Sequence, residues 1–193
     1  MKKEVKIAIA VIVIIAIIAI IATVIIMNSK PKTKLEPINS SDDLVALIDK
    51  VYEGQQESLP MLATQIVDVT DKDFVNMVTG LPNGDNFEYL VVSEPMMSSQ
   101  AYSFVLAKVK SGVDANKVAN EISEKINPAK WICVSAEKIY ATNSSDVICI
   151  VMSSEEWAKP VYEKFKNLAG YVEKEYEKTV QEPSIEDLEG LAY

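Results

Sequence analysis

The hydrophobic pattern divides the chain into one uninterrupted apolar run and a series of shorter amphipathic segments. Between Ile7 and Met27 there is no charged residue, and Thr23 is the single hydroxyl. As a helix this run would be about 31 Å long at 1.5 Å per residue, close to the roughly 30 Å hydrocarbon core of a bilayer. The pattern therefore predicts a single-pass transmembrane helix over residues 7–27.

The remaining segments follow helical or strand periods. Leu44, Leu47, Ile48 and Val51, for example, lie on one face of a helix that Gly54 ends. We expect helices over 41–54, 70–80, 114–126 and 153–168, the last broken at Pro160 and resumed over Tyr171–Val180. We expect strands over Ile66–Val69, Phe87–Glu94, Tyr102–Lys110, Trp131–Thr142 and Val147–Met152.

This order, α-β-α-β-β-α-β-β-α, predicts an α+β fold. Consecutive strands with short connections pair antiparallel, and we expect the helices to cover one face of a mostly antiparallel, partly ferredoxin-like sheet. The predicted organisation is an anchor with a short stub (1–27), a Pro- and Lys-containing linker (28–40), a soluble domain (41–181) and an acidic flexible tail (182–193).

The apolar run fits an uncleaved signal-anchor better than a signal peptide. A signal peptide has an apolar region of about 7–15 residues and a small-residue cleavage site, whereas Val24–Met27 ends this run with large side chains. Lysines flank it almost equally, so orientation depends on the short N-terminal stub, which favours a domain outside the cell membrane. A cytoplasm-facing domain is the alternative.

Charge and composition exclude several functions. The chain has a net charge of −9 and no His, and Arg is also absent from the sequence. An acidic domain without Arg is poorly suited to bind nucleic acid, because phosphate neutralisation dominates that affinity. The absence of His excludes Ser-His and Cys-His catalysis within one chain. The loop serines Ser98 and Ser144 have no Ser-x-x-Lys motif at a helix start, so we predict a non-enzymatic protein without a cofactor.

Two acidic clusters are candidate calcium sites. The first comprises Asp68, Asp71 and Asp73, and the second comprises Asn83, Asp85, Asn86 and Glu88. Neither follows the alternating acidic spacing of a calcium loop with a distal Glu. Asp71 and Asp73 are better explained as acidic residues in the first turn of a helix. We therefore predict no metal.

The two cysteines are predicted to be free and buried. If Asn143 and Ser144 centre the turn of the last hairpin, Cys149 lies opposite Lys138, and Cys133 lies about 16 Å further along. A disulfide requires Cα atoms within about 7 Å.

The loop after the strand Phe87–Glu94 is the candidate contact surface. Met96, Met97, Ser98 and Gln100 lie in it, and adjacent methionines in a polar loop can form an adaptable binding surface. The alternative is that one Met fills the edge of the sheet.

A stretch of about two thirds of the chain, from Asp42 to Leu168, resembles the bacterial family catalogued as domain of unknown function 4358. The resemblance rests on the strand Phe87–Glu94 with its Met/Ser loop, the strand Phe104–Lys110 and a final hairpin ending in Val151-Met152-Ser153. It implies an extracytoplasmic domain of a Gram-positive bacterium, where such domains are often lipoproteins. It implies no activity and no site residues, and this chain lacks a lipobox Cys.

These observations predict a membrane-tethered, extracytoplasmic binding or assembly module. Its expected partners are the lipid bilayer and an unknown protein at the outer membrane face. The alternative is a small-ligand sensor or an accessory subunit of a membrane enzyme complex.

Overall fold

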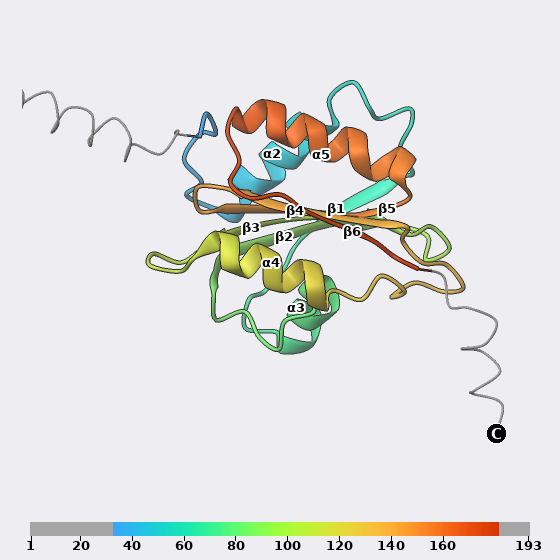
Figure 1. Cartoon of the computed structure of the whole chain (residues 1–193), viewed down its shortest axis with the longest axis horizontal. Helices are drawn as coiled ribbons and strands as arrows, with labels where there is room; N and C mark the ends of the chain where they lie inside the picture. The colour runs from blue at the N-terminus through green and yellow to red at the C-terminus, as the bar shows by residue number, and fades with distance from the viewer. Residues whose placement is uncertain (1–32, 182–193) are drawn as a thin grey trace, which may run out of the picture. The chain divides into compact units, whose positions relative to one another are not determined.

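The computed structural model describes residues 33–181, which form an antiparallel sheet between two layers of helices (Figure 1). The strands lie in the order β1-β2-β3-β5-β4-β6. The helices are α2 (Ser41–Tyr52), α3 (Lys72–Thr79), α4 (Ala115–Lys125) and α5 (Glu155–Ala169). The strands are β1 (Leu62–Ile66), β2 (Phe87–Pro95), β3 (Tyr102–Val109), β4 (Lys138–Ser144), β5 (Val147–Ser153) and β6 (Tyr176–Thr179).

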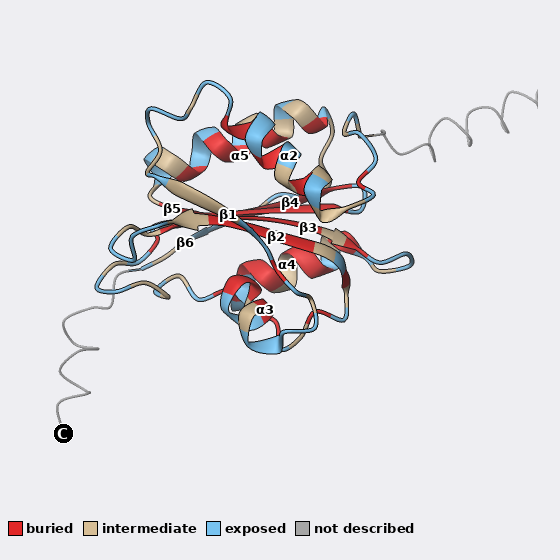
Figure 2. Ribbon diagram, turned by 180° about the vertical axis from the view of Figure 1, so that it is seen from behind, coloured by how far each residue is buried: buried red, intermediate tan, exposed pale blue. Residues whose placement is uncertain are grey.

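Side chains of the sheet alternate between two hydrophobic cores. Along β3, Val105 and Ala107 pack toward α3 and α4, whereas Phe104 and Leu106 pack toward α2 and α5. Successive strand residues point to opposite faces, so a strand with no polar alternation is buried on both sides. Figure 2 shows this buried centre, with exposed residues on the outer helix faces and the loops.

Local capping signals set the starts of the helices. At α2, the Asp43 amide donates to Ser40 Oγ (3.2 Å) and the Ser40 amide donates to Asp43 Oδ2 (2.9 Å), which is the reciprocal pair of a capping box. Asp71 and Asp114 accept from the third residues of α3 and α4 in the same way. These helices therefore begin where the sequence predicts, within two residues.

The predicted fold class is wrong as a whole, although the antiparallel α+β sheet is present. Within residues 33–181, no helix is long and apolar enough to cross a membrane, and the predicted span over 7–27 lies outside the described residues. Helices cover both faces of the sheet rather than one. The predicted order also fails at its end, because the strand β6 stands where we expected a helix over Tyr171–Val180.

Three predicted strand boundaries or registers are also wrong. β1 begins at Leu62, four residues before the predicted start. β4 begins at Lys138, and the predicted strand from Trp131 is irregular up to that point, with Cys133 in a left-handed backbone conformation (φ 60°). The final hairpin turns at Ser145 and Asp146, so Cys149 lies opposite Thr142 and not Lys138.

Pro160 lies inside α5 without breaking it. A proline removes one amide donor from the helix, and this one lies on the exposed face, where water can satisfy the carbonyl that loses its partner. The helix begins after Ser154, its N-cap residue, and not at Ser153, whose Oγ donates to the Ala101 carbonyl (2.6 Å).

Truncating an aromatic residue of α5 should lower the free energy of unfolding more when its side chain is more deeply buried. Phe165 is fully buried against the sheet, whereas Trp157 is half-buried. Phe165→Ala should lower the free energy of unfolding by about 3–5 kcal/mol, since it leaves a cavity in the core. Trp157→Ala should cost clearly less. Chemical denaturation of both variants measures this, and equal losses would contradict the packing of α5.

Candidate functional site

The most exposed apolar side chains gather at one end of the sheet. Met61, Met96, Met97 and Ile132 are 73 %, 68 %, 58 % and 66 % exposed. They come from the residue before β1, the β2–β3 loop and the stretch that follows α4. We call these four residues the tip.

Two backbone hydrogen bonds hold the three segments of the tip together. The Met96 amide donates to the Met61 carbonyl (3.1 Å), which extends the β1–β2 ladder by one pair. The Ile132 amide donates to the Ser98 carbonyl (3.1 Å), which joins the β2–β3 loop to the stretch after α4. The apolar side chains therefore project from backbone segments that are fixed to one another.

The four residues predicted from the sequence lie in this loop. Met96, Met97 and Ser98 are exposed, and Gln100 is half-buried. Among the described residues, Gln100 Oε1 is buried without a hydrogen-bond partner. Sequence reasoning missed Met61 and Ile132, because nothing local indicates that they lie beside the loop.

The cysteines are free, as predicted, but only one is buried. Cys149 is fully buried in the sheet, and this burial raises the pKa of its thiol well above the usual value. Cys133 is exposed beside Ile132. The prediction of two buried thiols is wrong for Cys133, since the segment around it is a loop and not a strand.

A largely buried ion pair lies behind the tip. Lys130 Nζ is 2.5 Å from Glu94 Oε1, and the two side chains are 7 % and 20 % exposed. Ser103 Oγ donates to the same carboxylate oxygen (2.8 Å), and Lys130 Nζ lies 3.2 Å from Ser103 Oγ. The pair fixes the stretch after α4 against β2 and β3.

The Ser103–Lys130 arrangement does not form a catalytic dyad. Burial lowers the pKa of the Lys130 ammonium, and the adjacent Glu94 carboxylate opposes this lowering. Ser103 Oγ donates to Glu94 and accepts from Lys130 Nζ, so its proton is not directed at the lysine. Ser103 is also only 1 % exposed, so a substrate could not reach its hydroxyl.

Residues of the two candidate calcium sites form hydrogen bonds with groups close to them in the sequence. Asp68 Oδ1 accepts from the amide and hydroxyl of Thr70, and these hydrogen bonds lower the pKa of its carboxyl. Asp71 caps α3, and Asn83 Oδ1 accepts from the Asp85 amide. Over residues 33–181, no three His, Cys, Asp or Glu side chains are placed to hold a metal ion.

At the opposite end of the sheet, residues 33–40 form a strap that lies on the domain. The Lys34 amide donates to the Ala169 carbonyl (2.8 Å) at the end of α5. Ile38 is only 6 % exposed and belongs to the core under α2 and α5. The predicted linker over 28–40 therefore differs from the structure in this half, which is packed and hydrogen-bonded.

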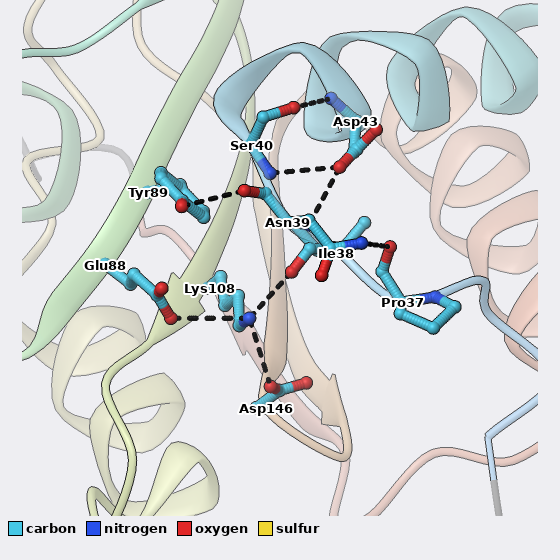
Figure 3. Close-up of polar contacts among 9 residues, drawn as sticks. All are labelled: Pro37, Ile38, Asn39, Ser40, Asp43, Glu88, Tyr89, Lys108 and Asp146. Atoms are coloured by element: carbon cyan, nitrogen blue, oxygen red, sulfur yellow. Dashed lines mark hydrogen bonds and ion pairs between the residues drawn. The ribbon is translucent and has the colours of Figure 1, made fainter.

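Lys108 is the central contact of the strap (Figure 3). Its Nζ donates to the Ile38 carbonyl (2.6 Å) and lies 3.3 Å from Glu88 Oε2 and 3.9 Å from Asp146 Oδ2. Beside it, Tyr89 OH donates to the Asn39 carbonyl (2.8 Å). These contacts place the start of the described chain at the end of the sheet far from the tip (Figure 1).

A small hollow lies between the strap and α2. Its volume is about 240 Å³, and it is lined by apolar Leu35, Ile38 and Leu47 together with Lys34 and Lys50. Ligand pockets for drug-sized molecules measure about 300–1,000 Å³. This hollow is smaller than that and lies away from the tip.

No family model, curated protein or solved structure matches this chain. The resemblance to the family of domain of unknown function 4358 therefore stays a prediction.

Substitutions of Glu94 and Lys130 should have strongly non-additive effects on the free energy of unfolding. Glu94→Gln leaves a buried ammonium without its counterion and should lower the free energy of unfolding by about 3 kcal/mol. The double variant Glu94→Gln/Lys130→Met should recover most of this loss, which a double-mutant cycle by chemical denaturation measures. As a control, Glu155→Gln at the exposed Lys159–Glu155 pair should change little. Additive effects at Glu94 and Lys130 would refute the coupling.

Removing the Lys108 ammonium should loosen the strap. Lys108→Met leaves the Ile38 carbonyl without its donor, so amide hydrogen exchange over residues 33–40 should be faster. Lys110→Met is the matched control, because Lys110 Nζ donates to the Asp85 carbonyl and does not contact the strap. Equal exchange of the strap in the two variants would show that Lys108 does not hold it.

Proposed function

We propose that this protein is a non-enzymatic binding or assembly module that is tethered to a membrane and contacts a protein partner through its tip. The observation that carries the proposal is the grouping of Met61, Met96, Met97 and Ile132 as exposed side chains at one end of the domain. Grouped exposed apolar side chains are typical of interaction surfaces.

The chemistry of the tip supports a protein partner. Methionine is flexible and polarizable, so a surface with three methionines can adapt to an apolar partner surface. The backbone beneath is fixed by the β1–β2 ladder and by the Lys130–Glu94 pair. A contact surface on a rigid support loses less conformational entropy on binding than a mobile loop.

Two observations support a non-enzymatic role. The chain has no His or Arg, which removes the commonest general base and the bidentate anion-binding side chain. The one serine–lysine pair beside the tip is buried and engaged by Glu94. The acidic net charge likewise argues against nucleic acid as a partner.

The membrane part of the proposal rests on the sequence. The uncharged run of residues 7–27 would hold the protein in the bilayer of the cell membrane, with the domain outside the cell. The strap follows this run closely in the sequence. The tip lies at the end of the sheet away from the strap, and its side chains are exposed.

A second candidate is a small-ligand sensor or an accessory subunit of a membrane enzyme complex. The hollow between the strap and α2 favours it, since apolar side chains and two lysines line a concave surface there. That hollow is small and open, and it does not include the Met loop. The tip therefore supports the first candidate better.

Site-specific photo-crosslinking in the native cells tests the tip. A photoreactive residue at Met97 or Ile132 of the full chain should give a discrete crosslinked protein, because these side chains would touch the partner. The control position is Ser111, an exposed residue of the β3–α4 loop, which lies beside Lys108 and Asp146. Met96→Ser/Met97→Ser should abolish the product formed from position 132 while changing unfolding stability by less than about 1 kcal/mol.

Two results would contradict the proposal. Crosslinking from position 111 equal to that from position 97 would show that the contact is not specific to the tip. A large loss of stability in the double serine variant would show that the methionines are part of the core rather than a contact surface.

A further inference from the structure

β1 is an edge strand of the sheet in the part of the chain that the structure describes. It pairs with β2 on one side only and ends the strand order of the sheet. In Figure 2, which faces this edge, β1 lies in front of the sheet. Unpaired edge strands present N–H and C=O groups that can pair with another strand.

The hydrogen-bond pattern identifies the outward groups. The Met96 amide donates to the Met61 carbonyl and the Val67 amide to the Leu90 carbonyl (2.9 Å), so odd-numbered residues of this segment bond to β2. In an antiparallel ladder the intervening residues direct their backbone groups to the other side. Among residues 33–181, no hydrogen bond engages these outward groups, which belong to Leu62, Thr64 and Ile66.

The two edges of the sheet differ in charge. β6, the opposite edge, carries Glu177 and Lys178. Charged residues on an edge strand discourage pairing with another chain. The segment from Met61 to Val67 has no charged residue, and Ile66 within it is 52 % exposed. The protective feature of β6 is therefore absent from β1.

We propose that β1 pairs antiparallel with β1 of a second copy of this chain, which joins the two sheets into one. The outward residues are symmetric about Thr64, so a two-fold axis there pairs Thr64 with its own copy and Leu62 with Ile66 of the second copy. Every outward backbone group then meets a partner. Each exposed Ile66 is placed beside a half-buried Leu62, which removes apolar surface from water.

Two copies of this acidic chain would repel each other less at the β1 edge than at their other surfaces. The protein carries a net charge of −9, so contact between most surfaces of two copies would bring like charges together. The β1 edge avoids this, because directly opposed side chains across the axis are uncharged.

The symmetry also suits a tethered protein. A two-fold axis perpendicular to the sheet keeps the α2 and α5 layers of both copies on the same face. The strap lies in that layer, since Ile38 packs in the core under α2 and α5. Both straps would then lie on one face of the joined sheet, at its two opposite ends. Tethering would in turn raise their effective concentration.

Disulfide trapping of the full chain in membranes tests the pairing. Thr64→Cys places two thiols opposite each other, and hydrogen-bonded antiparallel pairs have Cα atoms about 5.5 Å apart, within the range of a disulfide. The background variant is Cys133→Ser, because Cys133 is exposed, while Cys149 is buried and can remain. Mild oxidation should convert most of the chain to a covalent homodimer. Thr179→Cys on β6 is the matched edge control and should stay monomeric.

A second measurement does not depend on oxidation. Sedimentation of the full chain in detergent should show a dimer for wild type and for Thr64→Val, which keeps a strand-forming side chain. Thr64→Lys should lose the dimer, because two ammonium groups would face each other across the axis. Equal trapping from positions 64 and 179, a monomeric wild type, or a Thr64→Cys disulfide to a different protein would each overturn the proposal. None of these results depends on the partner of the tip.

Discussion

The arrangement depends on two central strands that have to bury both faces. Every residue of β5 is buried, and all of β3 except Lys108 is buried as well. A strand without a solvent-facing side is stable only when helices cover the sheet on both sides. This requirement places α2 and α5 on one face and α3 and α4 on the other. It also confines charged side chains to the ends and edges of the sheet, where the strap and the tip are found.

One lysine at each end of the sheet holds a neighbouring segment of the chain against it. Lys108 and Lys130 each direct an ammonium to a backbone carbonyl and to a glutamate of β2, Glu88 in one case and Glu94 in the other. An ammonium has three donors and no acceptor, so one lysine can join several oxygens from segments that are distant in the sequence. In a chain without Arg, these two point charges attach the strap and the stretch after α4 to the same strand.

The parts of the fold that the sequence predicts are those with strong local signals. Capping residues such as Ser40 and Asp114 mark the starts of α2 and α4, and the runs of β-forming apolar residues in β2 and β3 are clear. β6 has no such signal. Its four residues are half-buried or exposed, and their Glu and Lys are common in helices, so the strand exists because β4 offers it an edge. The irregular stretch after α4 has the same difficulty, since its apolar residues are typical of a strand although the structure has none there.

The same distinction explains why only half of the tip could be found from the sequence. Met96 and Met97 are adjacent in a polar loop, which is a local pattern. Met61 and Ile132 join them through hydrogen bonds to Met96 and to Ser98, and these bonds depend on strand register and on the position of Lys130. Register in turn follows from which side chains must face each core, because a shift by one residue would move every side chain of the strand to the other face. A surface built in this way is therefore a consequence of core packing, and a change in the core that shifts β1 by one residue would separate the tip without altering any of its side chains.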